Sequence, residues 1–199
     1  EQGKINPMSL EALQGAQEVA TQTNASVTAI TFNKIAAESL SQYDLAEILI
    51  LDDPKLEDYN PLLYLKAIEE VYQLESPDIL FFGHTYETRD WVPRLSARLD
   101  IPFLSDCIGF QISDTLTLTR SIYQGKFNAN YKTNTEKFIV SFQSGSFRMD
   151  AIKTGTASIR NLSVDLSGDF DSIKLGDKFQ ESAQSVDLTQ ADVIVSVGR

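Results

Sequence analysis

Hydrophobic residues in the first half of the chain recur alternately with helical and with strand spacing. Within residues 9–23, Leu10, Leu13 and Ala16 are three apart, which is typical of a helix with one buried face. Ser9 precedes this run and is expected to cap the helix. The same pattern predicts strands at 26–32, 47–53 and 78–83, and helices at 35–43, from Pro61 to about Leu74, and from the third strand to about Leu99.

These predicted strands are apolar on both faces and alternate with helices. Strands of this kind lie inside a sheet, and helical crossovers between them favour parallel pairing. Parallel strands need long connections to return to the same sheet edge, and these crossovers are right-handed. The first half of the chain therefore predicts an open, mostly parallel α/β sheet.

The pattern changes after Pro102. Four short strand-like segments follow, at residues 107–113, 116–123, 127–133 and 137–143, with the turn-like sequences "DT", "QG" and "NTE" between them. We expect an antiparallel β meander, at about residues 105–145, added to the sheet.

The last fifty residues divide into a polar part and an apolar end. Residues 150–190 are weakly periodic and are expected to be irregular, with short strands at 162–166 and 172–175. Residues 191–199, "ADVIVSVGR", have the pattern of a buried strand that ends in glycine and arginine. We therefore predict one α/β unit over residues 1–190 and the first strand of a second domain over 191–199.

Composition restricts the possible partners. A formal charge of −11 disfavours binding to nucleic acid or to anionic lipid. The single cysteine, Cys107, cannot form an internal disulfide, which indicates a reducing compartment, and the sequence has no Cys/His cluster for zinc. No apolar run approaches the roughly 18–20 residues that cross a bilayer. We expect a globular intracellular protein that binds neither nucleic acid nor membrane.

The stretch "GHTYETRDWVPRLSARLDIPFLSD" at residues 83–106 contains the only histidine and the only tryptophan. Asp90 is expected to cap a helix whose first turn contains Pro93, where the missing N–H costs no hydrogen bond. Trp91 and Leu95 are four residues apart and predict a buried stripe on that helix.

Two residues just before this helix are candidates for a site. His84 and Arg89 are expected in the loop after a strand, at the sheet edge where open α/β folds bind ligands or partners. A lone histidine without a nearby nucleophile is expected to be structural, and no catalytic triad is predicted. A phosphate-binding loop is not expected either, because "SFQSGSF" at residues 141–147 has no helix after it.

Four motifs together carry a resemblance to a known family. They are "LFFGHTYETRDWVPRLSARLDIPFLSD", "RSIYQGKFNANYKT", "SFQSGSF" and "LTQADVIVSVGR", and their order and spacing are similar to those of electron transfer flavoprotein α subunits. The resemblance implies a Rossmann-like N-terminal domain of the adenine nucleotide α hydrolase type, with a strand ahead of residue 1. It further implies that "SVGR" opens a C-terminal FAD domain, although Val197 stands where that family has glycine.

The resemblance also implies a function. An electron transfer flavoprotein is a heterodimer of α and β subunits that carries electrons from flavin dehydrogenases to a quinone reductase, so this chain would be a scaffold and subunit interface and not an enzyme. FAD is expected in the intact heterodimer and not in this chain alone. A bacterial protein would be cytoplasmic and a eukaryotic one would lie in the mitochondrial matrix. The alternative is a free-standing adenine-nucleotide-binding domain of the stress-protein type.

Five residues are the candidates for these contacts. Arg199 follows the last apolar run and is expected, in the intact protein, either to contact an anionic part of FAD or to pair with an acid that holds the two domains together. Arg89 and the aromatic residues Tyr123, Phe127 and Tyr131 are expected at the subunit interface, because aromatic side chains concentrate at interface centres. Packing in the core is the competing explanation for the aromatic residues. No catalytic residue and no metal ligand is predicted.

Overall fold

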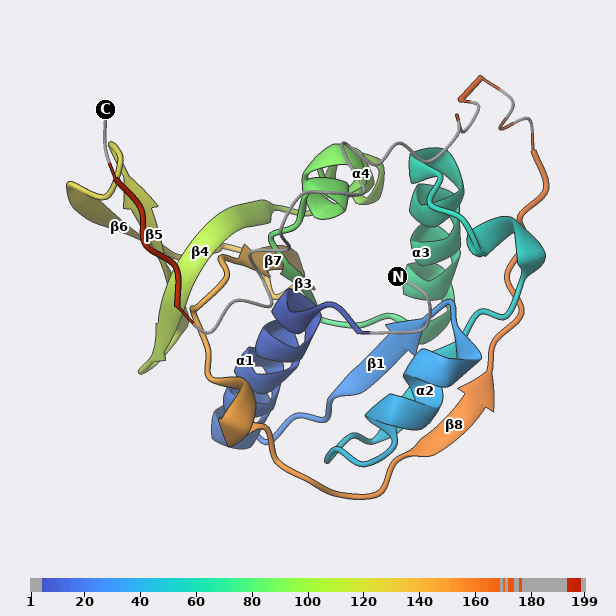
Figure 1. Cartoon of the computed structure of the whole chain (residues 1–199), viewed down its shortest axis with the longest axis horizontal. Helices are drawn as coiled ribbons and strands as arrows, with labels where there is room; N and C mark the ends of the chain where they lie inside the picture. The colour runs from blue at the N-terminus through green and yellow to red at the C-terminus, as the bar shows by residue number, and fades with distance from the viewer. Residues whose placement is uncertain (1–4, 169, 171, 174–175, 177–192, 198–199) are drawn as a thin grey trace.

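The computed structural model describes residues 5–168, 170, 172–173, 176 and 193–197. In this part of the chain, eight strands form two sheets with helices packed against them (Figure 1). The strands are β1 (Thr28–Thr31), β2 (Glu47–Ile50), β3 (Ile79–Gly83), β4 (Phe103–Ile112), β5 (Leu116–Ile122), β6 (Phe127–Tyr131), β7 (Phe138–Phe142) and β8 (Ser158–Asn161).

The smaller sheet has the strand order β1-β2-β8, and the larger sheet has the order β3-β7-β4-β5-β6. Both pairings of the smaller sheet are parallel, as are the pairings of β7 with β3 and with β4. The pairings of β4 with β5 and of β5 with β6 are antiparallel. The expected α/β class, with mostly parallel strands and an antiparallel meander, is confirmed, and its strands form two sheets.

Four α-helices connect these strands, and each begins at a residue whose side chain accepts a backbone N–H. The caps are Asn6, Asn33, Asn60 and Thr85, residue types that suit this position because their short side chains reach the free donors of the first turn. The helices are α1 (Pro7–Thr23), α2 (Lys34–Leu40), α3 (Pro61–Glu75) and α4 (Tyr86–Leu99), with single 3-10 turns η1 (Pro54–Leu56) and η2 (Met149–Ala151).

The central strand of the smaller sheet, β2, is buried on both faces. Ile48 and Ile50 of β2 pack with α1 and α2, whereas Leu49 and the following Leu51 pack with α3. Side chains of a strand alternate between the two faces, so the continuous apolar run of β2 supplies both layers.

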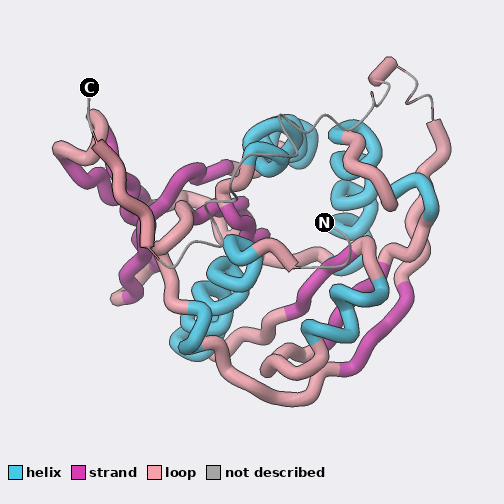
Figure 2. The backbone as a smooth tube through the Cα atoms, in the orientation of Figure 1, coloured by secondary structure: helices cyan, strands magenta, loops and turns pink. Residues whose placement is uncertain are grey.

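In the larger sheet, β7 is likewise buried on both faces. Ile139 joins α3 and α4, with Trp91 and Leu95 in the same cluster. Phe138 and Phe142 point to the opposite face and pack with β4 and β5. Figure 2 shows the outer strands of this sheet extending to one side, away from the helices.

The predicted start of α4 is wrong. Thr85 caps the helix by accepting from the N–H of Thr88, so Asp90 lies inside the helix and accepts a hydrogen bond from the Tyr59 hydroxyl at 2.8 Å. Pro93 is therefore an interior proline, which leaves the carbonyl of Arg89 without its helical N–H partner. The predicted cap of α1 is also displaced, because Asn6 and not Ser9 caps it.

Of the four strands in the expected meander at 105–145, only β4, β5 and β6 pair as a meander. The fourth, β7, inserts between β3 and β4 with parallel pairing. All five of its residues are buried, as suits a strand in the middle of a sheet.

Two of the strands predicted near the C-terminus are those at 162–166 and at 191–199. The strand expected at 162–166 lies four residues earlier, as β8, because residues 158–161 pair with β2. Within the predicted strand at 191–199, residues 193–197 have no strand structure and their apolar side chains are exposed, since no described strand pairs with them. None of the helices in the described residues combines the length and the apolarity needed to cross a bilayer.

Candidate functional site

A group of polar side chains lies at the carboxyl ends of β3 and β7, beside the middle of β4. The chain bends in β4, where the pairing register with β7 shifts between Leu104 and Cys107 and Asp106 takes a left-handed φ of 63°. A left-handed conformation is unusual for a residue with a side chain, so the surrounding contacts must hold Asp106 in place.

Three of these side chains lie in contact, since Ser141 is hydrogen-bonded to His84 and His84 faces Asp106. The Ser141 hydroxyl lies 2.9 Å from His84 Nδ1 and accepts from the backbone N–H of Asp106 at 3.2 Å. His84 Nε2 faces the Asp106 carboxylate at 3.5 Å. With neutral His84, this arrangement is satisfied when Ser141 donates to Nδ1 and the ring proton is on Nε2.

Burial and nearby charges shift the acid–base behaviour of this group. Desolvation lowers the pKa of His84, Arg89 and Arg120 lower it further, and Asp106 opposes them. Burial also raises the pKa of the Cys107 thiol to about 12. At neutral pH the site therefore contains a neutral imidazole and a neutral thiol beside Arg120.

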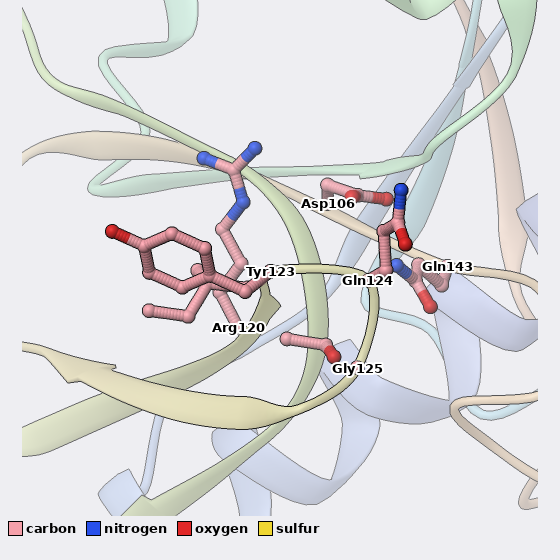
Figure 3. Close-up of a pocket in the computed structure, with 8 residues that line it drawn as sticks. Asp106, Arg120, Tyr123, Gln124, Gly125 and Gln143 are labelled. Carbon is pink, nitrogen blue, oxygen red and sulfur yellow. The ribbon is translucent and has the colours of Figure 1, made fainter.

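A cavity of about 570 Å³ opens beside Asp106, between β4 and the turn that joins β5 to β6. Figure 3 shows Asp106, Gln124 and Gln143 gathered on one side of it, and Arg120 and Tyr123 on the other. The cavity is lined by Asp106, Arg120, Ser121, Ile122, Tyr123, Gln124, Gly125 and Gln143.

The turn that frames the cavity has an uncommon backbone. Tyr123, Gln124 and Gly125 all have left-handed φ values, of 51°, 56° and 82°. Glycine takes this conformation without cost, but Tyr123 and Gln124 do not. Strained backbone of this kind is found at functional sites, and here it directs the Tyr123 side chain outward.

The arrangement lacks the accessible nucleophile that a catalytic triad needs. Ser, His and Asp are the residue types of a catalytic triad, but the Ser141 side chain is fully buried, so its hydroxyl cannot reach a substrate. Among the described residues, no group of three or more His, Cys, Asp or Glu side chains is placed to hold a metal ion. Arg120 remains as a cation that can bind an anion at the cavity.

The structure brings some of the predicted site residues together. The Tyr123 and Phe127 rings are in edge contact at a centroid distance of 6.0 Å. Tyr123, Phe127 and Tyr131 are 75%, 63% and 41% exposed, so packing in the core does not account for them. Arg89 lies in the first turn of α4, not in a loop, and its guanidinium sits over the Tyr86 ring. Arg199 lies outside the described residues.

Sequence reasoning missed the partners of His84. Ser141 and Asp106 come from β7 and β4, and only the parallel insertion of β7 brings them to His84. The available signal was the serine inside the apolar strand "FIVSF", because a buried hydroxyl needs a partner.

Comparisons with known proteins identify the family of this fold. The family model for the electron transfer flavoprotein domain matches residues 1–167. The chain is 29% identical over 165 residues to the electron transfer flavoprotein subunit alpha of Bacillus subtilis, covering 82% of this chain and 50% of that protein. It is 26% identical to the subunit of the same name in Thermoanaerobacterium thermosaccharolyticum, covering 99% and 62%.

A eukaryotic protein is similar as well. The chain is 25% identical to the probable mitochondrial electron transfer flavoprotein subunit alpha of Caenorhabditis elegans, with 98% of this chain and 58% of that protein covered. The chain thus spans between half and two thirds of the length of these relatives. The resemblance in the four sequence motifs is confirmed, and the chain belongs to the electron transfer flavoprotein family.

Proposed function

We propose that this chain is the N-terminal part of an α subunit that works as an electron carrier and not as an enzyme. The intact protein would take electrons from flavin dehydrogenases and pass them to a quinone reductase. The observation that carries this proposal is the family match over residues 1–167, together with relatives named α subunit that align with nearly the whole chain. The fully buried hydroxyl of Ser141 supports the absence of hydrolytic chemistry here.

The FAD domain would follow the part of the chain described above. Residues 191–199 would form its first strand, which explains why the apolar side chains of 193–197 are exposed in this chain. Arg199 would then contact an anionic part of FAD, and this chain alone would bind no FAD.

The partner would be the electron transfer flavoprotein β subunit. The exposure of Tyr123, Phe127 and Tyr131 supports their assignment to that interface, because exposed aromatic side chains on one hairpin are costly without a partner. Arg89 would lie at its margin. The protein would work in the cytoplasm of a bacterium or in the mitochondrial matrix of a eukaryote.

A free-standing nucleotide-binding domain is less well supported. In open α/β folds a nucleotide lies at the carboxyl ends of the strands. At that edge β2 leads into Asp52 and Asp53, whose charges would repel phosphate groups.

The test uses the full-length α subunit produced together with its β subunit. We expect a 1:1 heterodimer with one equivalent of FAD that a flavin dehydrogenase reduces when its substrate is added, and no flavin absorbance in residues 1–199 alone. Arg199→Ala should weaken FAD retention or shift its reduction potential. Arg98→Ala is the control, because Arg98 pairs with Glu69 on the exposed side of α4. A heterodimer without flavin, or one equivalent of FAD on residues 1–199 alone, would refute the proposal.

A further inference from the structure

One face of the outer strands carries an arginine surrounded by apolar side chains. Arg120 of β5 is paired with Cys107 of β4 and with Ala129 of β6. Paired residues point to the same face of a sheet, and so do residues two positions apart along a strand. Arg120 therefore shares its face with Phe127 and Tyr131, which stand on either side of Ala129.

This face is buried at one end and open at the other. Leu118 and Cys107 are buried in the core cluster beneath the sheet. Towards the hairpin end, Phe127 and Tyr131 are exposed, and Tyr123 adds its ring beside Phe127. The outer part of the face has the composition of an interface centre, where aromatic residues and arginine predominate.

The guanidinium of Arg120 lacks an acceptor within the described residues. Its Nε is buried and has no hydrogen-bond partner there. A buried N–H without an acceptor is destabilising, and more so on a charged group. The nearby Asp106 is held by His84 and Ser141 and forms no ion pair with Arg120 in this part of the chain. A molecule that binds this face can supply the acceptor that the described residues do not provide.

Charge identifies the chemistry of that acceptor. Residues 115–135 contain Arg120, Lys126 and Lys132 and no acidic residue, although the whole chain carries a charge of −11. The other side chains on the cavity wall include the neutral amides of Gln124 and Gln143 and the carboxylate of Asp106. Asp106 would repel a phosphate dianion more strongly than a carboxylate, which carries one negative charge, so a carboxylate is the better match for Arg120.

We propose that Arg120 binds a carboxylate side chain of the β subunit, with Tyr123, Phe127 and Tyr131 packed around the pair. This inference rests on the proposed function, which assigns the same hairpin to the β subunit. The aromatic side chains exclude water from the pair, and in a water-poor site an arginine–carboxylate contact is strong and specific in its geometry. Arg120 would then be the anchor of the interface.

The experiment measures dissociation of the purified full-length αβ heterodimer by dilution and mass photometry. We expect Arg120→Gln to raise the dissociation constant about 30-fold or more, and Arg120→Lys to raise it less, because lysine keeps the charge but not the forked geometry. Lys126→Gln removes an exposed cation from the same hairpin and should change it less than about fivefold. The heterodimer with Arg120→Gln should also lose most of the salt dependence of dissociation.

The outcomes separate this inference from the proposed function. Phe127→Ala tests the hairpin interface without the arginine. Weakening by Phe127→Ala but not by Arg120→Gln would overturn the carboxylate anchor and leave the β-subunit interface intact. No weakening by either variant would overturn both assignments. Loss of FAD at unchanged αβ affinity in Arg120→Gln would place the acceptor in the α subunit's own FAD domain and overturn the proposed partner.

Discussion

Gly83, the last residue of β3, lies directly against Met8 in the first turn of α1. A Cβ atom added to Gly83 would come within 2.8 Å of the Met8 carbonyl oxygen and within 2.7 Å of its Cβ. Backbone atoms on both sides of this contact cannot move aside as a flexible side chain can. Glycine at position 83 therefore permits α1 to pack against the end of β3.

Gly83→Ala is expected to lower the free energy of unfolding by about 1–3 kcal/mol, because the added methyl group overpacks the contact with α1. Urea unfolding followed by the fluorescence of Trp91, which is buried and is the only tryptophan, measures the change. Gly109→Ala is the matched control, since its added Cβ has no atom within 4 Å. Equal losses in the two variants would contradict the steric explanation.

Stability is expected to fall as the pH drops below about 6.5, because burial lowers the pKa of His84 in the folded chain. The unfolded chain then takes up a proton that the folded chain does not, at a cost of up to about 1.4 kcal/mol per pH unit. His84→Gln should remove this part of the decline between pH 7.5 and 5.5, since His84 is the only histidine. If the free energy of unfolding changed with pH equally in the wild type and the variant, His84 would have the same pKa in the folded and the unfolded chain, which would contradict this prediction.

The thiol of Cys107 is expected to be unreactive in the folded chain, because it is fully buried and its pKa is raised to about 12. An aromatic disulfide reagent at pH 8 should modify it only at the rate of unfolding, and at once in urea, with one thiol per chain. Met149→Cys introduces an exposed thiol as the positive control. Rapid modification of Cys107 without denaturant would show that β4 opens in the native state.

The helices and the first three strands could be predicted because their apolar spacing is local information. The start of α4 could not, since both Thr85 and Asp90 are residues that cap helices well. Tertiary contacts decide between them. Thr88 is buried and its hydroxyl donates to the carbonyl of Gly83 at 2.7 Å, which holds one more turn of helix against the end of β3.

The order of the strands in the larger sheet could not be predicted from the sequence pattern, for a different reason. Turn-like residues between β6 and β7 suggested a continued meander, but pairing depends on what each strand buries. The five residues of β7 are buried and apolar apart from Ser141, which suits a central strand, whereas β6 exposes four of its five residues and suits an edge. Ser141 and Asp106 reach the candidate site only through this strand order, so His84 was the one member of the group that the sequence could predict.

The closure of the smaller sheet by β8 affects how the chain folds. Arg160 on β8 bonds to Glu47 on β2 although 113 residues separate them in sequence, and the same arginine reaches Glu75 at the end of α3. During synthesis, β1 and β2 leave the ribosome long before their third strand exists, and the edge of β2 stays open for that time. Contacts of such long range slow folding because the loop must close before they form. An open strand edge of this kind exposes the nascent first half of the chain to aggregation until β8 has been made.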